Sequence, residues 1–382
     1  MIRYLLENSH GCILTLVPKK GLAAQREKEL EEKLEAYRSS LSEEELNTMV
    51  EKTKALEAYQ ESEEDPEALE CIPMLKRSDI KKEAGNFVNE ELSVDDSLFL
   101  YHEVCTNGIG YVDLMFKTDS IAPEQIPYLG LLKSVLGYVD TKEHTYGELF
   151  NEINANTGGI NCGVEVFDRA DSTEEFQAMF SVRGKALYTK LDFLFKMIQE
   201  ILNSSKLEDT KRLYEIIASV KSRAQVNLTG AGHSTAVLRA TAYSSPMAAF
   251  QDEMAGIGYY QFIEMLEKDF DQRKEETVEE LRRLMKEILR PENFIISYTG
   301  EKESLETVKK LALSVKEGLC TDPVERSQDK LTCTKKNEGF KTSGQVQYVA
   351  QTGNFKKKGL EYTGALEILK VILSYDYLWM NL

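Results

Sequence analysis

The chain has 382 residues, of which 42% are hydrophobic and 29% are charged, and its formal net charge is −17. This length suggests two or three domains of about 100–200 residues each, and the apolar content is that of a globular protein with packed cores. The negative charge disfavours nucleic acid as a partner, because phosphate binding requires clustered Lys and Arg. We interpret the acidity as favouring solubility, with long-range attraction of basic peptides as the alternative.

The two ends of the chain show no export or membrane signal. The first twelve residues, MIRYLLENSHGC, contain too short an apolar patch for a signal peptide. The apolar stretch near the C-terminus includes Glu367, Lys370 and Asp376, so we expect no membrane-spanning helix. The six cysteines lie far apart and form no CxxC pair, which predicts reduced thiols and a cytoplasmic location.

Residues 1–20 are expected to be the end of a preceding domain. The β-branched and apolar run at 11–17 predicts a buried strand. Because a helical pattern follows directly, the sheet partners of this strand must come from elsewhere in the sequence.

Residues 21–80 are predicted to form a helical hairpin followed by an extended linker. Ser42 and Glu45 have the spacing of a capping box at the start of the second helix. Apolar side chains recur at helical spacing and predict a narrow seam between the helices: Leu30, Leu34 and Tyr37 on the first, and Leu46, Met49, Val50 and Thr53 on the second. We expect a brace or hinge, not an active site.

Residues 85–290 have the pattern of an α+β domain, in which helices cover one face of an antiparallel sheet. Strands at 97–105 and 109–117 flank Asn107-Gly108, a pair of residues typical of a hairpin turn. Further strands are expected near 160–167 and 174–184. Long helical patterns follow at 187–203, 208–226 and 258–288.

Residues 291–382 are predicted to begin a second α+β domain. A strand at 293–299 and a helix at 302–317 open it, and a further helix is expected from 359 to 382. That last helix ends without a C-cap glycine or a polar tail, so the domain is expected to be truncated.

No local zinc site is predicted. None of the four histidines has the HExxH or HxxEH spacing that puts two imidazoles one helical turn apart: His10, His102, His144 and His233. His144 and Glu148 are four residues apart, but Thr145 is expected to cap a helix between them. A metal role for this pair is therefore disfavoured.

Three further patterns have ordinary structural explanations. Ser234 lies in a sequence that approximates the GxSxG elbow of serine hydrolases, but a helix precedes it where that motif requires a strand. We therefore favour a helix start over a serine hydrolase, which remains the alternative. Gly108-Ile109-Gly110 lacks the third glycine of a dinucleotide site. One aromatic cluster is interpreted as core: Tyr259, Tyr260 and Phe262.

Several segments, in chain order, carry a family resemblance: YLLENSHGCILTLVPKKGL, VCTNGIGYVDLMF, YGELFNEINANTGGI, GAGHSTAVLRATAYSSP, GIGYYQFIEML and SGQVQYVAQTGNFKKKG. Together with the helical hairpin, they resemble the presequence protease branch of the pitrilysin- or insulinase-like zinc peptidases. In that family one chain carries two similar halves, each of two α+β domains, which are joined by the hairpin and close around a peptide chamber.

The resemblance implies that the zinc-binding HxxEH helix and a later Glu belong to a domain outside this sequence. In the domain at 85–290, Tyr128, Leu131 and Leu132 stand where the first His, the Glu and the second His of that helix would be. Family members also supply an Arg and a Tyr to the substrate from a segment like RVKGGAYG, which this sequence does not include. No catalytic or metal-binding residue is therefore expected here.

The resemblance thus implies the non-catalytic part of a zinc metalloendopeptidase that degrades unstructured peptides and encloses them in a chamber. The alternative is a stand-alone inactive partner subunit of a two-subunit peptidase. The expected partners are a catalytic half, which would hold the zinc, and unstructured peptides. Apolar surfaces at 11–17 and 360–382 also predict self-association.

Overall fold

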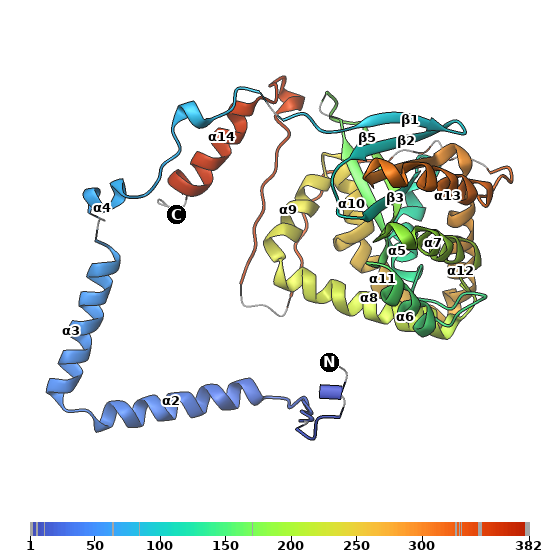
Figure 1. Ribbon diagram of the computed structural model, residues 1–382. Coiled ribbons are helices and arrows are strands. Elements are labelled where there is room, and N and C mark those ends of the chain that lie inside the picture. Colours follow the sequence, from blue (N-terminus) through green and yellow to red (C-terminus); the bar gives the residue numbers. More distant parts are fainter. Residues whose placement is uncertain are drawn as a thin grey trace. The chain divides into compact units, whose positions relative to one another are not determined.

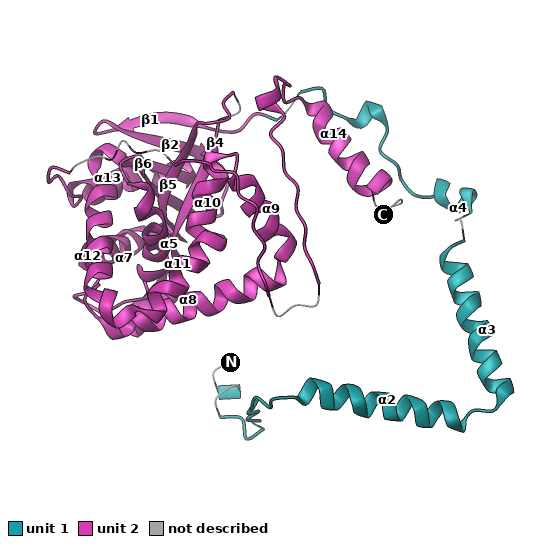
Figure 2. Ribbon diagram, turned by 180° about the vertical axis from the view of Figure 1, so that it is seen from behind, with its two compact units in different colours: residues 1–85 teal, residues 86–382 magenta. Residues whose placement is uncertain are grey.

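The computed structural model describes residues 3–378, except for 5, 6, 11, 63, 64, 84, 170, 325, 326, 328, 330 and 343–345. After Gly85 the chain divides into two units, residues 1–85 and 86–382 (Figure 2). Each unit is described separately below.

The first unit consists of helices α2 (Leu22–Ser40), α3 (Glu43–Gln60) and α4 (Pro66–Glu70). The predicted capping box is confirmed. The Ser42 hydroxyl accepts a hydrogen bond from the Glu45 backbone N–H, and the Glu45 carboxylate accepts one from the Ser42 N–H at 2.9 Å. The two orphan donors at the start of α3 are thereby satisfied.

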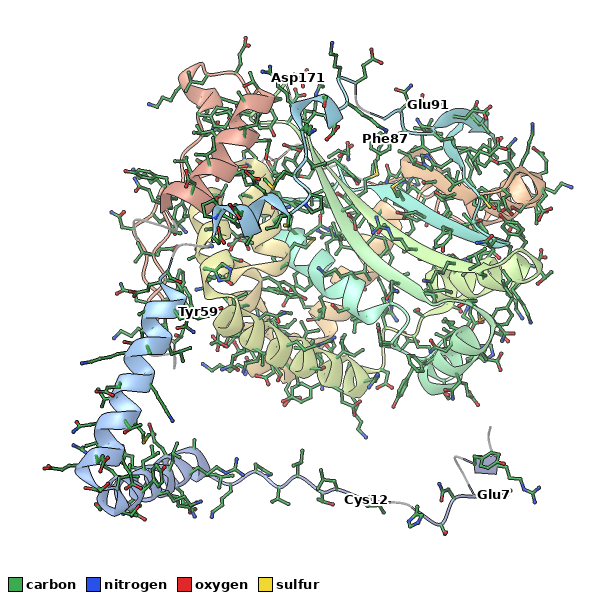
Figure 3. The ribbon with its side chains drawn as sticks, turned by 60° about the vertical axis from the view of Figure 1, so that its left-hand side comes forward. Glu7, Cys12, Tyr59, Phe87, Glu91 and Asp171 are labelled. Atoms are coloured by element: carbon green, nitrogen blue, oxygen red, sulfur yellow. The ribbon has the colours of Figure 1, made fainter. Side chains whose placement is uncertain are left out.

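The predicted apolar seam is wrong. No residue of α2 or α3 is buried, and Leu34 is 57% exposed. Residues rich in Glu, Lys, Leu and Ala form helices through local propensity, so a helix arises here whether or not its narrow apolar stripe is covered. Tyr59 of α3, labelled in Figure 3, is likewise exposed.

The predicted strand at 11–17 is also wrong for its described part. Residues 12–17 are exposed and adopt no regular structure, and Gly11 lies outside the described residues. The cause is the lack of a partner, because a strand requires a neighbour to accept its hydrogen bonds and the described part of the first unit contains no other strand.

The second unit is built on one six-stranded sheet in the order β1-β2-β6-β3-β5-β4 (Figure 1). The strands are β1 (Glu90–Val94), β2 (Ser97–Glu103), β3 (Ile109–Lys117), β4 (Ile160–Asp168), β5 (Phe176–Leu187) and β6 (Phe294–Gly300). All neighbours are antiparallel except β2 and β6, which run parallel. The sheet is therefore mixed, whereas the sequence predicted an antiparallel one.

The hairpin predicted between β2 and β3 is not formed, because β6 lies between these strands. Asn107 and Gly108 do adopt positive φ, 53° and 80°. Their loop crosses the end of β6, where Val104 N–H donates to the carbonyl of Gly300 and Thr106 N–H donates to the carboxylate of Glu301. A turn signal describes the local backbone, and it leaves open which strand lies alongside.

Helices cover one face of the sheet. On β3, Val112, Leu114 and Phe116 point into the core, while the alternate residues Tyr111 and Asp113 lie on the other face. The covering helices are α5 (Ile126–Val135), α6 (Tyr146–Asn156), α7 (Leu191–Ser204), α8 (Thr210–Gly230), α9 (Gly232–Ala242), α10 (Pro246–Ala255), α11 (Ile257–Lys268), α12 (Phe270–Ile288) and α13 (Leu305–Glu317). The helix predicted at 258–288 is two helices, which meet at Asp269.

The predicted domain boundary at 290–291 is also wrong. β6 pairs with both β2 and β3 in the middle of the sheet, and buried residues of α13, such as Val308, belong to the same core. An apolar strand such as Phe294–Gly300 is typical of a central position, and the sequence alone does not indicate which sheet it completes. The predicted terminal helix begins at Gly364 as α14 (Gly364–Ile372), and residues 379–382 lie outside the described part.

Within the described residues, none of the helices has the length and apolar character that crossing a bilayer requires.

Candidate functional site

The helix at the predicted zinc position is a core helix. In α5, Leu131 and Leu132 are buried, and Tyr128 is only 8% exposed. The Tyr128 ring packs edge-on against Phe262, with 4.8 Å between ring centroids. Apolar and phenolic side chains do not provide the imidazole and carboxylate ligands that zinc needs. Across the described residues, His, Cys, Asp and Glu form no group of three or more suited to a metal ion.

Gly130 explains how closely α5 is packed. A Cβ atom at this position would lie 2.6 Å from the backbone oxygen of Met254 and 2.7 Å from the ring of Tyr259. The glycine therefore lets α5 approach α10 and α11. This contact anchors the helix in the core and leaves no room for a ligand at its centre.

His144 and Glu148 point to different partners. The imidazole Nδ1 lies 2.8 Å from the carboxylate of buried Glu200, and this hydrogen bond raises the pKa of His144. Glu148 instead completes a capping box with Thr145, whose backbone N–H lowers the pKa of the Glu148 carboxyl. The cap was correctly predicted from the sequence, which carries no signal for the pairing with Glu200.

Ser234 does not lie on a nucleophile elbow. It occupies the first turn of α9, which follows α8 after a single intervening residue, Ala231. The sharp turn between a strand and a helix that exposes such a nucleophile is therefore missing at this position. In the aromatic cluster, Tyr259 is buried in the core as predicted, whereas the Tyr260 hydroxyl donates to Glu264 near the surface.

The face of the sheet that helices leave uncovered, here called the open face, carries two rows of polar side chains. Strand register places Lys185, Tyr111 and Thr299 opposite one another on β5, β3 and β6. Two residues further along each strand, and so on the same face, the second row consists of Arg183, Asp113 and Ser297.

An ion-pair network holds the second row. Arg183 Nε lies 2.7 Å from Asp113 Oδ2, and Arg183 Nη1 lies 3.0 Å from Glu165 Oε1. Burial raises the pKa of Asp113, and the hydrogen bond from Arg183 opposes this increase only in part. A cavity of about 400 Å³ opens beside this network, lined by both rows together with Asn161 and Gly158-Gly159.

A second cavity, of about 560 Å³, lies between the β4–β5 connection, the α9–α10 junction and residues 351–356. Lys357 closes one side of it. Its ammonium lies 2.7 Å from the Glu174 carboxylate and donates to the carbonyl of Ser244 at 2.9 Å. These contacts attach the C-terminal extended segment to the α+β unit.

The same extended segment is held by a cluster of Arg239, Tyr243, Asp252 and Glu338, here called the Arg239 cluster. The guanidinium contacts Asp252 at 2.5 Å and Glu338 at 2.8 Å, and the Tyr243 hydroxyl donates to Glu338. Asp252 also accepts from the first backbone N–H groups of α11. Sequence reasoning missed this cluster, because Glu338 is 99 residues away from Arg239.

Comparison with known proteins decides the family. Residues 16–266 match the family described as associated with peptidase M16, subfamily C. The chain belongs to this family.

Relatives of this peptidase-associated chain include proteins named as presequence proteases, which confirms the predicted resemblance. Protein HypA of Clostridium perfringens is 35% identical over 377 residues, which cover 99% of this chain and 38% of HypA. Presequence protease 1, chloroplastic/mitochondrial, of Arabidopsis thaliana is 28% identical and covers 99% of this chain, with 35% of its own length aligned. The chain thus spans little more than a third of these relatives.

A solved structure described as a peptidase M16 inactive domain, from Pseudomonas fluorescens, aligns with a TM-score of 0.43 and 15% sequence identity. The alignment covers 63% of the peptidase-associated chain and 53% of the solved one.

Proposed function

We propose that this peptidase-associated chain is the non-catalytic part of a zinc metalloendopeptidase that degrades unstructured peptides. The observation that carries the proposal is α5. At the positions where the family's zinc helix presents its ligands, α5 has Tyr128, Leu131 and Leu132, and all three are buried in the core. The zinc would therefore be bound by a catalytic half, with no ligand from this helix.

The open face supports a role as part of the chamber wall. Helices bury one side of the sheet, while the other side carries exposed polar rows and a cavity. An enclosed peptide needs hydrogen-bonding groups along its path, because buried polar groups without partners cost free energy. The proposed partners are accordingly a catalytic half and unstructured peptides. A cytoplasmic location remains our proposal from the dispersed cysteines.

The proposal is tested by reconstituting cleavage. A fluorogenic unstructured peptide is offered to four samples: this chain, an HxxEH-bearing catalytic half, the two together, and the pair in which this chain is extended through an RVKGGAYG-like segment. We expect cleavage that chelators abolish from the extended pair only, because metal and substrate-orienting residues then act on one peptide. Chelator-sensitive turnover by this chain alone, or no turnover by the extended pair, would contradict the proposal.

A further inference from the structure

The cavity on the open face has a net positive lining in a strongly acidic protein. Its charged lining residues are two cations, Arg183 and Lys185, and one carboxylate, Asp113, whereas the whole chain has a formal charge of −17. We propose that this cavity binds the carboxylate of an Asp or Glu side chain in a bound peptide. The inference deepens the proposed function, since it names a feature of the peptide that the chamber wall recognises.

Lys185 is the cation available to a ligand. Arg183 is already engaged by Asp113 at 2.7 Å and Glu165 at 3.0 Å, so its charge is compensated. The ammonium of Lys185 has no ion-pair partner among the residues that the structure describes. A carboxylate entering the cavity would therefore meet one uncompensated positive charge, partly shielded from water.

Gly158 positions the side chain of Lys185. A Cβ atom at residue 158 would lie 2.6 Å from Lys185 Cγ and 2.7 Å from its Cε, so the aliphatic stem lies directly across the glycine. The Gly158 N–H also donates to the carbonyl of Lys185 at 2.7 Å. A lysine stem held in this way loses less conformational freedom on binding than a free surface lysine does.

Hydroxyl groups complete the site. Tyr111 and Thr299 share the row of Lys185, and Ser297 follows in the next row. In the described part of the chain, the hydroxyls of these three side chains have no hydrogen-bond partner. A carboxylate offers about four lone-pair sites, so one ammonium and neighbouring hydroxyls match its acceptor capacity.

The test uses peptides that are acetylated and amidated, so that a side chain provides the only carboxylate. One peptide carries a central Glu and its partner carries Gln, and binding to this chain is measured by fluorescence anisotropy at low and high salt. We expect the Glu peptide to bind about tenfold more tightly than the Gln peptide, as for one charged hydrogen-bonded pair. This preference should decrease as salt increases.

Variants locate the effect. Lys185→Met should abolish the preference for Glu, and Gly158→Ala should reduce it by displacing the lysine stem. Lys117→Met is the matched control, because Lys117 lies on the same face of β3 but does not line the cavity, and this variant should keep the preference. Equal binding of both peptides, an equal loss in Lys117→Met, or a preference that requires a free C-terminus would each overturn the proposal.

The two proposals fail separately. Chelator-sensitive cleavage by the extended pair without any Glu preference would refute the carboxylate site alone. A Glu preference that Lys185→Met removes, without cleavage by the extended pair, would refute the peptidase assignment and leave the site in place.

Discussion

At the scale of single residues, the Arg239 cluster is the most demanding arrangement in the unit. Asp252, whose side chain is only 2% exposed, is an ionised group within the fold, and Arg239 is its cationic partner. Contact with Arg239 lowers the pKa of Glu338 to about 2, so this ion pair persists at every physiological pH. Such a cluster contributes mainly by avoiding an unpaired buried charge.

Replacing Arg239 tests this interpretation. Arg239→Met should destabilise the chain by about 3–5 kcal/mol, because it leaves the carboxylate of Asp252 buried without a cation. Arg169→Met is the control, since Arg169 pairs with Asp171, labelled in Figure 3, and both side chains are more than half exposed. That variant should cost less than about 1 kcal/mol. Similar losses in urea unfolding for the two variants would show that Asp252 is not effectively buried.

The pair of His144 and Glu200 should make stability depend on pH. The pKa of His144 is raised above its usual 6.5, chiefly by its hydrogen bond to Glu200, while Glu148 and Glu152 nearby act in the same direction. The stabilisation is therefore fully present below that usual value and is lost as the pH rises through the folded-state pKa. His144→Asn should lower the melting temperature more at about pH 5.5 than at about pH 8.5. Equal decreases would show that the charged pair does not form.

At the scale of helices and strands, α2 and α3 separate propensity from packing. Leu34 is exposed in the structure, so Leu34→Asp should change the free energy of unfolding by less than about 0.5 kcal/mol. Thermal unfolding of the variant measures this directly. A loss of several kcal/mol would mean that the apolar stripe of α2 is buried against another surface in solution.

Local signals in the sequence account for much of this fold. Periodicity predicted α2, α3 and the long helices of the second unit, and capping residues predicted the starts of α3 and α6. The strand β1 was missed because its segment, EELSV, is mostly polar. Its turn carries Asp95 and Asp96 at positive φ, a conformation that Asp tolerates.

Pairing between distant segments could not be predicted from these patterns. The insertion of β6 between β2 and β3 joins residues almost 200 positions apart, and the pattern of an apolar strand does not specify its neighbours. The polar rows of the open face depend on that insertion, because Thr299 and Ser297 come from β6. The candidate site could therefore not be predicted from the sequence, although Tyr111 and Asp113 lay in a predicted strand.

At the scale of the whole molecule, exposed apolar side chains on α14 predict self-association. Ile368 is 65% exposed, and Leu369, Val371 and Ile372 are exposed as well. Apolar patches of this kind promote contact between copies of a chain. Sedimentation should detect dimers or larger species whose fraction grows with protein concentration. A monomer at every concentration, with replacement of Ile368 by Lys making no difference, would contradict this expectation.

The central claim is that this peptidase-associated chain contributes fold and surface to a zinc peptidase but no metal site. Its most direct test is the zinc content of tag-free protein that has been incubated with zinc and then dialysed. With Tyr128, Leu131 and Leu132 buried at the positions of the family's zinc ligands, we predict far less than about one zinc ion per chain. About one tightly held zinc ion per chain, removable only by a chelator, would contradict the account.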